Sequence, residues 1–218
     1  MPIARNSWTV RDKLDRQDSA TRARLLTAAR TVFEQRGYAR TTIADITAQA
    51  DVGRATFYVY FASKQDVFAV LAADLRDRFL AAQEAADPEA EDPYLLAERT
   101  NAAFLDAYVD NLAFMTVLEH QSLTDPAMRV LRDEISDRPR GRTTRYIARL
   151  VRQGLAEPAG SPESVATAAA GMVAGFARAV AADPACRDRA VADLTAMYLR
   201  LLGLTPRAGA PAPGRGRG

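Results

Sequence analysis

The stretch TTIADITAQADVGRATFYVYF, residues 41–61, decides the fold that the sequence predicts. Its first half spaces apolar residues three and four apart, as an amphipathic helix does, at Ile43, Ile46 and Ala50. The DVG that follows is too short for anything but a tight turn. The second half, RATFYVYF, is compatible with a helix or a strand.

The aromatic residues of RATFYVYF fit either structure. In a helix Phe57 and Phe61 share one face while Tyr58 and Tyr60 point elsewhere, and in a strand alternation pairs the two phenylalanines and the two tyrosines. The context favours a helix, because helical patterns stand on both sides and leave an isolated strand without a pairing partner. Two helices joined by so short a turn form a helix-turn-helix, whose second helix enters the major groove of DNA.

Helical patterns fill most of the remaining chain. We predict one helix from Asp18 to the stop at Gly37 and a long one over 63–86. Five more are predicted over 94–110, 112–123, 126–154, 162–182 and 187–203. Pro139 and Gly141 are expected to kink or break the helix that contains them. The predicted fold class is therefore all-α, with about nine helices.

The net charge of +2 is unevenly distributed. Residues 1–62 hold ten Arg and Lys against six Asp and Glu, whereas residues 63–206 hold sixteen against twenty-one. The excess of basic residues in 1–62 suggests that only this N-terminal part binds a polyanion, although ordinary fluctuation in surface charge gives the same pattern. The single cysteine, Cys186, and an apolar run over 164–177 that is too short for a membrane span predict a cytoplasmic protein with no metal, cofactor or membrane partner.

From about Ser19 to Phe68 the sequence resembles the DNA-binding domain of TetR (tetracycline-repressor) family transcriptional regulators. The resemblance rests on the order and spacing of VFEQRGY, TTIADIT, TFYVYF and SKQDVF. Two positions depart from the usual pattern, since Asp51 replaces a turn glycine and Gly53 replaces a Ser or Thr helix cap. Asp tolerates the left-handed conformation, and Gly is an acceptable cap without a side-chain acceptor, so the fold should survive both changes.

The resemblance implies a homodimeric regulator, most often a repressor, that binds a palindromic operator in double-stranded DNA and responds to a small, largely hydrophobic effector. It implies an N-terminal three-helix DNA-binding domain and a C-terminal helical domain for ligand binding and dimerisation. The expected parts are a flexible basic arm (1–18), the helix-turn-helix domain (19–66), the ligand-binding and dimerisation domain (67–205) and a disordered tail (206–218).

Carried over by motif position, DNA contacts are expected at Thr42, Arg54, Ala55, Thr56, Tyr58, Tyr60 and Lys64. The Arg54 fork suits guanine O6 and N7, and the two tyrosine hydroxyls suit phosphates. Thr42 and Lys64 lie near helix N-termini, which attract phosphate. The alternatives are solvated side chains for the Arg and Lys, and packing against neighbouring helices for the tyrosines. The basic arm is a further candidate, for a minor groove.

The C-terminal domain supplies two further sets of candidates. Apolar walls with a few polar groups describe a ligand pocket, and equally a core, at Phe104, Tyr108, Phe114, Met115, Leu118, His120 and Gln121. A dimer interface is expected on the last two helices, although the same faces would equally bury within one subunit, at Ala166, Ala170, Val173, Ala177, Leu194, Tyr198 and Leu201.

Two other functions compete with a ligand-responsive regulator. A helical enzyme is disfavoured, because the chain has one His, one Cys, no Gly-rich phosphate loop and neither an H-E-x-x-H nor a G-x-S-x-G motif. No catalytic residue is therefore predicted. A ligand-independent architectural or interaction protein would use the same helix-turn-helix, and only a ligand pocket separates it from the main hypothesis.

Overall fold

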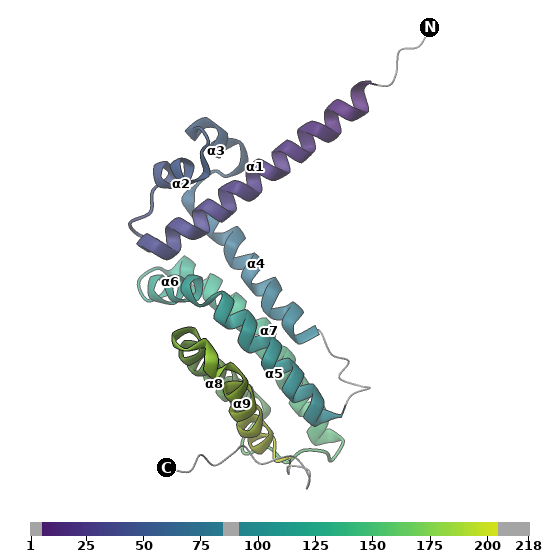
Figure 1. The fold of residues 1–218 in the computed structure, drawn as a ribbon. Helices are drawn as coiled ribbons and strands as arrows, with labels where there is room; N and C mark the ends of the chain where they lie inside the picture. The colour runs from purple at the N-terminus through teal and green to yellow at the C-terminus, as the bar shows by residue number, and fades with distance from the viewer. Residues whose placement is uncertain (1–5, 85–91, 205–218) are drawn as a thin grey trace. The chain divides into compact units, whose positions relative to one another are not determined.

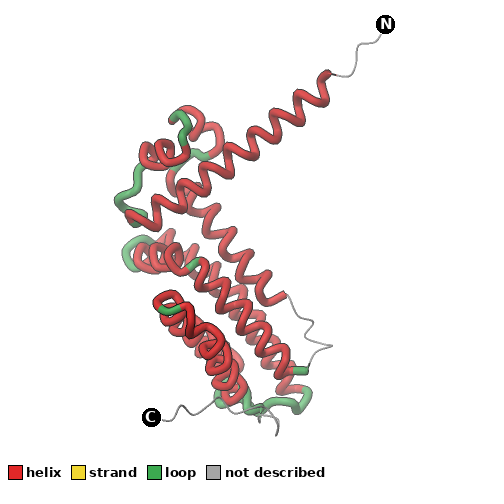
Figure 2. Tube along the Cα trace, in the orientation of Figure 1, coloured by secondary structure: helices red, strands yellow, loops and turns green. Residues whose placement is uncertain are grey.

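A computed structural model describes residues 6–84 and 92–204 of the chain. Within these ranges the backbone forms nine α-helices and one short 3-10 helix, with no strand (Figures 1 and 2). The elements are α1 (Asn6–Arg36), α2 (Ile43–Ala50), α3 (Arg54–Tyr60), α4 (Lys64–Glu84), α5 (Pro93–Asp110), α6 (Leu112–Ser122), α7 (Pro126–Arg152), α8 (Pro162–Ala182), η1 (Pro184–Cys186) and α9 (Arg187–Leu201). The predicted all-α class and number of helices are confirmed.

The first helix is longer than predicted. α1 begins at Asn6 and not near Asp18, so most of the segment expected as a flexible arm is helical. The physical reason is that residues 6–36 contain neither proline nor glycine, so nothing in the sequence ends the helix before its amphipathic part. Residues 1–5 and the predicted tail, 206–218, lie outside the described residues.

Of the kink or break predicted at Pro139 and Gly141, the break is wrong, because α7 continues through both residues. A proline removes one backbone donor from a helix, and contacts nearby can offset the loss. The carbonyl of Pro139 accepts hydrogen bonds from Thr143 Oγ1, one turn further on, at 3.2 Å and from Gln83 Nε2 of α4 at 3.3 Å. Helix α4 thus contacts α7 at Pro139, where α7 stays unbroken.

The chain divides into two compact units. Unit 1 comprises Met1–Ala73 and Phe114–Leu131, and unit 2 comprises Asp74–Ala113 and Arg132–Gly218. In unit 1, α1 packs against α2 and α2 packs against α3 (Figure 1). Most of α6 belongs to this unit, where Phe114 stacks on Phe68 of α4 with ring centroids 4.8 Å apart. The functional boundary expected near residue 66 stays a prediction.

Unit 2 is built on α5, which packs against both α8 and α9 (Figure 1). Its main apolar cluster consists of Ala97, Ile147, Leu150, Val165, Ala166, Tyr198, Leu199, Leu202 and Leu204. Arg187, at the start of α9, holds Asp106 of α5 through two hydrogen bonds, Nε to Oδ1 at 2.7 Å and Nη2 to Oδ2 at 2.6 Å. Burial raises the pKa of the Tyr198 hydroxyl, as expected for a phenol inside this cluster.

Among the described residues, α8 is the one helix long and apolar enough, by length and composition alone, to cross a membrane. One of its faces, which includes Val165, Val173 and Val180, is buried in unit 2, as in a core helix. Only 28% of its apolar window is buried, however, so much of the surface of α8 is exposed in a single chain.

Candidate nucleic-acid interface

The N-terminus of α2 is capped by side chains of its own first turn. Thr42 lies at the helix N-terminus, as expected, and caps it in a capping box: Asp45 N donates to Thr42 Oγ1 at 3.2 Å, and Thr42 N donates to Asp45 Oδ2 at 2.9 Å. Arg36 Nη1 lies 2.6 Å from Asp45 Oδ1. Hydrogen bonds from the hydroxyl and backbone of Thr42, with a further contribution from Arg36, hold the pKa of Asp45 below its usual range. A phosphate at Thr42 would compete with this carboxylate, and that contact stays a prediction.

The turn between α2 and α3 is held by α1. Asp51 adopts the left-handed conformation with φ 50° and ψ 54°, which glycine usually supplies and which an aspartate tolerates. Arg24 Nη2 donates to the carbonyl oxygens of Ala50 at 2.6 Å and Asp51 at 3.2 Å. Gly53 caps α3 without a side-chain hydrogen bond. Arg24 was not predicted, because its partners lie 26 and 27 positions away and no local pattern reveals them.

The two phenylalanines of α3 fix which of its faces points outward. Phe57 and Phe61 are buried, with ring centroids 5.8 Å apart, and the Arg22 guanidinium lies 5.5 Å from the Phe61 ring centroid. Thr56 and Tyr60 are half-buried. The exposed residues are Arg54, Ala55, Tyr58 and Val59, which together form what we call the outer face of α3.

Two of the predicted DNA contacts meet on this outer face. Arg54 Nη2 donates to the Tyr58 hydroxyl at 3.3 Å, and the guanidinium carbon lies 5.8 Å from the Tyr58 ring centroid. Tyr58 keeps 48% of its surface exposed. The pair is spaced one helical turn apart, so Tyr58 supports the arginine while both polar tips stay accessible.

Lys64 is tied into unit 1. Its ammonium donates to the carbonyl oxygens of Tyr38 and Thr41, both at 2.8 Å, and lies 4.3 Å from the Tyr38 ring centroid. Burial lowers the pKa of Lys64. The first turn of α4 is thereby fastened to the loop between α1 and α2, a structural role that the sequence did not predict. Its contact with a phosphate stays a prediction.

The geometry of this region matches a known family of DNA-binding domains. Residues 25–71 match the sequence profile of a family described as bacterial regulatory proteins, tetR family. This part of the chain is therefore a TetR-family DNA-binding domain. The matched range includes all of α2 and α3, so their helix-turn-helix is the DNA-binding motif of this domain. No protein of curated function matches the sequence.

Solved structures of TetR-family proteins share the fold over most of the chain. A bacterial regulatory protein of the tetR family from Rhodococcus RHA1 is 24% identical, with a TM-score of 0.72 over 85% of this chain and 98% of that one. Salmonella enterica GusR is 18% identical, with a TM-score of 0.71 over 84% and 95%. The TetR family transcriptional regulator PfmR from Thermus thermophilus is 23% identical, with a TM-score of 0.67 over 83% and 98%.

The residues predicted to bind a ligand are divided between the units. In unit 2, Phe104 and Tyr108 of α5 contact Phe79 of α4, with ring centroids 5.2 and 5.6 Å apart. The other five lie in unit 1, where Phe114, Met115 and Leu118 are buried, Gln121 is half-buried and His120 is exposed. The aromatic residues thus pack as core side chains, the alternative that the sequence left open. Their binding of a ligand stays a prediction.

The residues predicted for a dimer interface lie on α8 and α9 in unit 2. Five of them are buried within their own subunit: Ala166, Val173, Ala177, Leu194 and Tyr198. A side chain that is buried within one subunit has almost no accessible surface left for contact with a partner. Leu201 is half-buried and only Ala170 is exposed, so most of this set packs as core, the alternative that the sequence left open, and a role in a dimer stays a prediction.

Proposed function

We propose that this TetR-family regulator is a ligand-responsive repressor that binds a palindromic operator as a homodimer. The observation that supports DNA reading most directly is the outer face of α3, held outward by the buried Phe57. A helix of this kind fits the major groove, where an arginine fork binds guanine O6 and N7 and a tyrosine hydroxyl reaches phosphate. Arg54 and Tyr58 supply these groups one turn apart.

Binding sites selected from random duplex DNA with the full chain would test this proposal. On a selected site, Arg54→Ala should weaken specific binding by about 1–3 kcal/mol, measured by fluorescence anisotropy. Arg152→Ala is the matched control, because it removes the same charge from an exposed position near the end of α7. Failure of the wild-type chain to select any sequence would contradict the proposal, and equal losses in the two variants would contradict the role of Arg54.

The exposed face of α8 supports a homodimer. Gly171 and Gly175 lie one turn apart in the middle of this helix, and a Cβ at either would meet no other atom within 4 Å. Each glycine costs roughly 0.5–1 kcal/mol relative to alanine in a helix, and nothing within the described chain requires it. A second helix that approaches closely provides a reason for both, and two copies suit a palindromic operator.

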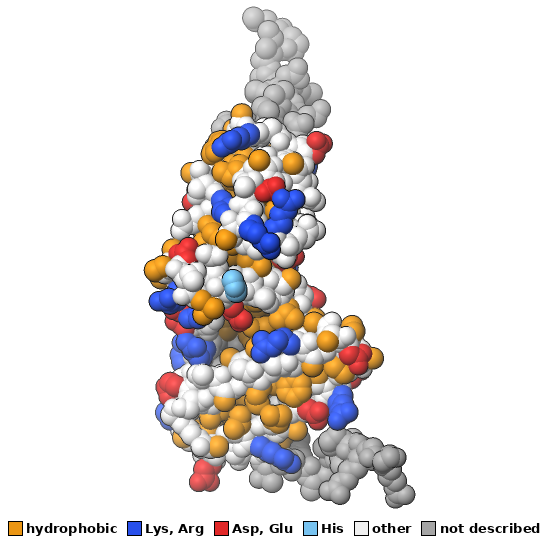
Figure 3. All heavy atoms as spheres, turned by 90° about the vertical axis from the view of Figure 1, so that its left-hand side faces the viewer, with side chains coloured by type: hydrophobic (Ala, Val, Ile, Leu, Met, Phe, Trp, Pro, Cys, Tyr) orange, Lys and Arg blue, Asp and Glu red, His pale blue; other side chains and the backbone are white. Residues whose placement is uncertain are grey.

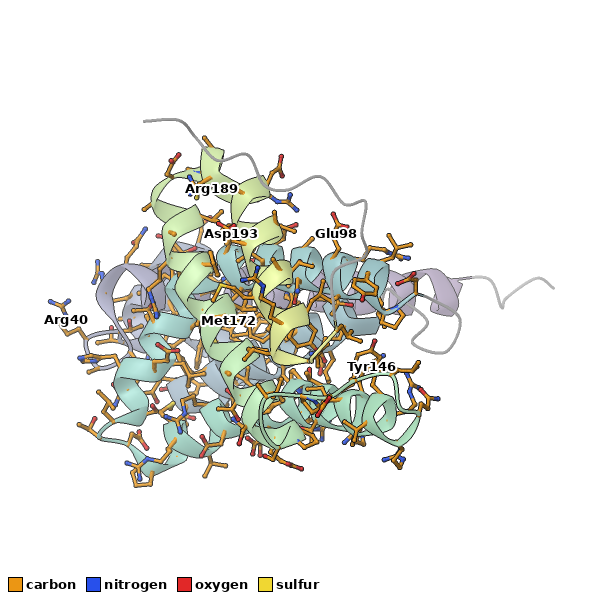
Figure 4. All side chains as sticks on the ribbon, turned by 90° about the horizontal axis from the view of Figure 1, so that it is seen from below. Arg40, Glu98, Tyr146, Met172, Arg189 and Asp193 are labelled. Atoms are coloured by element: carbon orange, nitrogen blue, oxygen red, sulfur yellow. The ribbon has the colours of Figure 1, made fainter. Side chains whose placement is uncertain are left out.

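The composition of the exposed surface of α8 and α9 is compatible with binding of a second copy of the chain. Hydrophobic side chains gather over the part of unit 2 formed by α8 and α9, in the lower part of Figure 3. Arg189 and Asp193 lie on α9 toward one end of this region, 3.7 Å apart, and Met172 lies nearer the middle of α8 (Figure 4). Met197, also on α9, is exposed. An apolar centre with charged residues beside it is the usual composition of a protein interface.

Helix α4 is the element that we propose to couple an effector to DNA binding. Its second half carries Phe79, which packs on Phe104 and Tyr108 in unit 2, and its first turn carries Lys64, which holds the α1–α2 loop in unit 1. A hydrophobic effector that displaces the partners of Phe79 would move α4 and weaken operator binding. Such coupling requires the effector to prefer one of the two states.

A thermal-shift screen of hydrophobic metabolites and drugs on the full chain tests the effector. A binding compound should raise Tm and weaken operator binding, and Phe79→Leu should change the dose at which both effects occur. A compound that raises Tm and leaves DNA binding unchanged would contradict the coupling. A screen without any binding compound would favour the ligand-independent alternative, in which the packed aromatic residues are core alone.

A further inference from the structure

Val59 is a residue of the outer face of α3 to which neither the sequence motif nor the mechanism above gives a role. It is 75% exposed, the highest value among the large hydrophobic side chains that the structure describes as exposed. Isolated apolar residues are ordinary on a protein surface. Val59 is not isolated, because Ala55 lies one turn before it and Tyr58 beside it, and both are exposed.

The helical rotation places Val59 on the side of α3 that lies opposite the buried Phe57. Ala55 and Val59 each lie two positions from the fully buried Phe57, which is about 200° of rotation in an α-helix. They are therefore on the side of α3 opposite to the one that packs on unit 1. Arg54 and Tyr58 lie to one side of these two residues, and Thr56 and Tyr60, on the other side, are half-buried. The part of α3 that projects furthest from unit 1 is thus apolar.

The apolar side chains of Ala55 and Val59 restrict which base pairs this side of α3 can contact favourably. In the major groove the base edges present hydrogen-bond donors and acceptors, and the one methyl group among them is the C5-methyl of thymine. A valine pressed against a polar edge removes water from it and provides no hydrogen bond in exchange, which is unfavourable. Against a thymine methyl the same side chain buries apolar surface on both partners.

We infer that Val59 is a specificity-determining residue that selects a thymine in each operator half-site by contact with its methyl group, with Ala55 allowing the close approach. The inference rests on the proposed DNA-binding function and adds to it. Arg54 then reads a guanine by hydrogen bonds and Val59 reads a thymine by apolar contact, so the half-site contains both bases within the reach of one short helix.

The test uses the full chain and a site selected from random duplex DNA. Each thymine is replaced in turn, in both half-sites, by deoxyuridine, which lacks only the C5-methyl. At one position the wild-type protein should bind the deoxyuridine site about four-fold more weakly per methyl lost, so about sixteen-fold for both half-sites. Val59→Ala should bind the thymine and deoxyuridine sites with equal affinity at that position.

A matched control separates this effect from a general loss of apolar surface. Val130→Ala changes another exposed valine of unit 1, on α7 and outside the outer face of α3, and should discriminate thymine from deoxyuridine as the wild type does. The inference is overturned if Val59→Ala keeps the wild-type discrimination or if no thymine is sensitive in the wild type. A wild-type chain that selects no sequence overturns the proposed DNA reading itself, so the two failures are distinguishable.

Discussion

Replacement of Lys64 by methionine separates a structural role of this lysine from a phosphate contact. The variant keeps an unbranched apolar stem and removes the ammonium, which donates two hydrogen bonds of 2.8 Å to backbone carbonyls and lies 4.3 Å from the Tyr38 ring centroid. Each hydrogen bond from this charged donor contributes about 1.5–3 kcal/mol, and a partly exposed cation–π contact contributes about 0.5–1 kcal/mol.

The expected net loss is smaller than the sum of these values. In the variant, water can reach the partly buried carbonyls of Tyr38 and Thr41. The methionine sulfur can also contact the Tyr38 ring and so replaces part of the lost cation–π contact. We expect Lys64→Met to lower the free energy of unfolding by about 1–3 kcal/mol. Urea unfolding of the full chain, followed by circular dichroism, measures this difference.

The salt dependence of operator binding supplies the second measurement. A lysine that neutralises a phosphate contributes about −0.9 to the slope of log K against log salt concentration, whereas a purely structural lysine leaves the slope unchanged. We expect a weaker affinity with an unchanged slope, because the lost bonds loosen the unit that holds α3. Arg54→Met is the control, since its exposed side chain should leave unfolding unchanged. Unchanged stability together with a slope reduced by about 0.9 per protomer would refute the structural role.

Two further predictions concern the cap of α2 and the exposed face of α8. Asp45→Asn should destabilise the protein at neutral pH, and the difference should shrink as pH falls from about 4 through the lowered pKa of Asp45, because the wild-type carboxylate is then protonated. Urea unfolding of both proteins from pH 7 to pH 2 measures this, and a difference independent of pH would exclude the carboxylate as its source. Gly171→Leu should convert the dimer to monomers in sedimentation velocity, because it fills the space into which a second helix is proposed to pack. Ala127→Leu, at an exposed position on α7, should leave the dimer intact, and a dimeric Gly171→Leu would contradict this interface.

Features that depend on a few neighbouring residues followed from the sequence. The place of Thr42 at a helix N-terminus was predicted from the local pattern, and the shared buried face of Phe57 and Phe61 follows from their spacing of four in a helix. The left-handed conformation of Asp51 agrees with the resemblance, which placed this residue where a turn glycine usually stands. Each of these depends on backbone geometry that a segment of about ten residues already contains. The order of motifs around them also identified the family.

Other features were settled only by tertiary structure. The spacing of Ala166, Val173 and Ala177 on α8 indicated one apolar face, but only the packing of α5 and α9 decided that this face is buried within the unit and that Gly171 lies outside. The bonds of Arg24 and Lys64 join residues 23 to 27 positions apart, and no local periodicity encodes such a distance. Hydrogen bonds and rotations within one helix are determined locally, whereas the inward face of an apolar helix and the partner of a long cationic side chain depend on which elements the fold brings beside them.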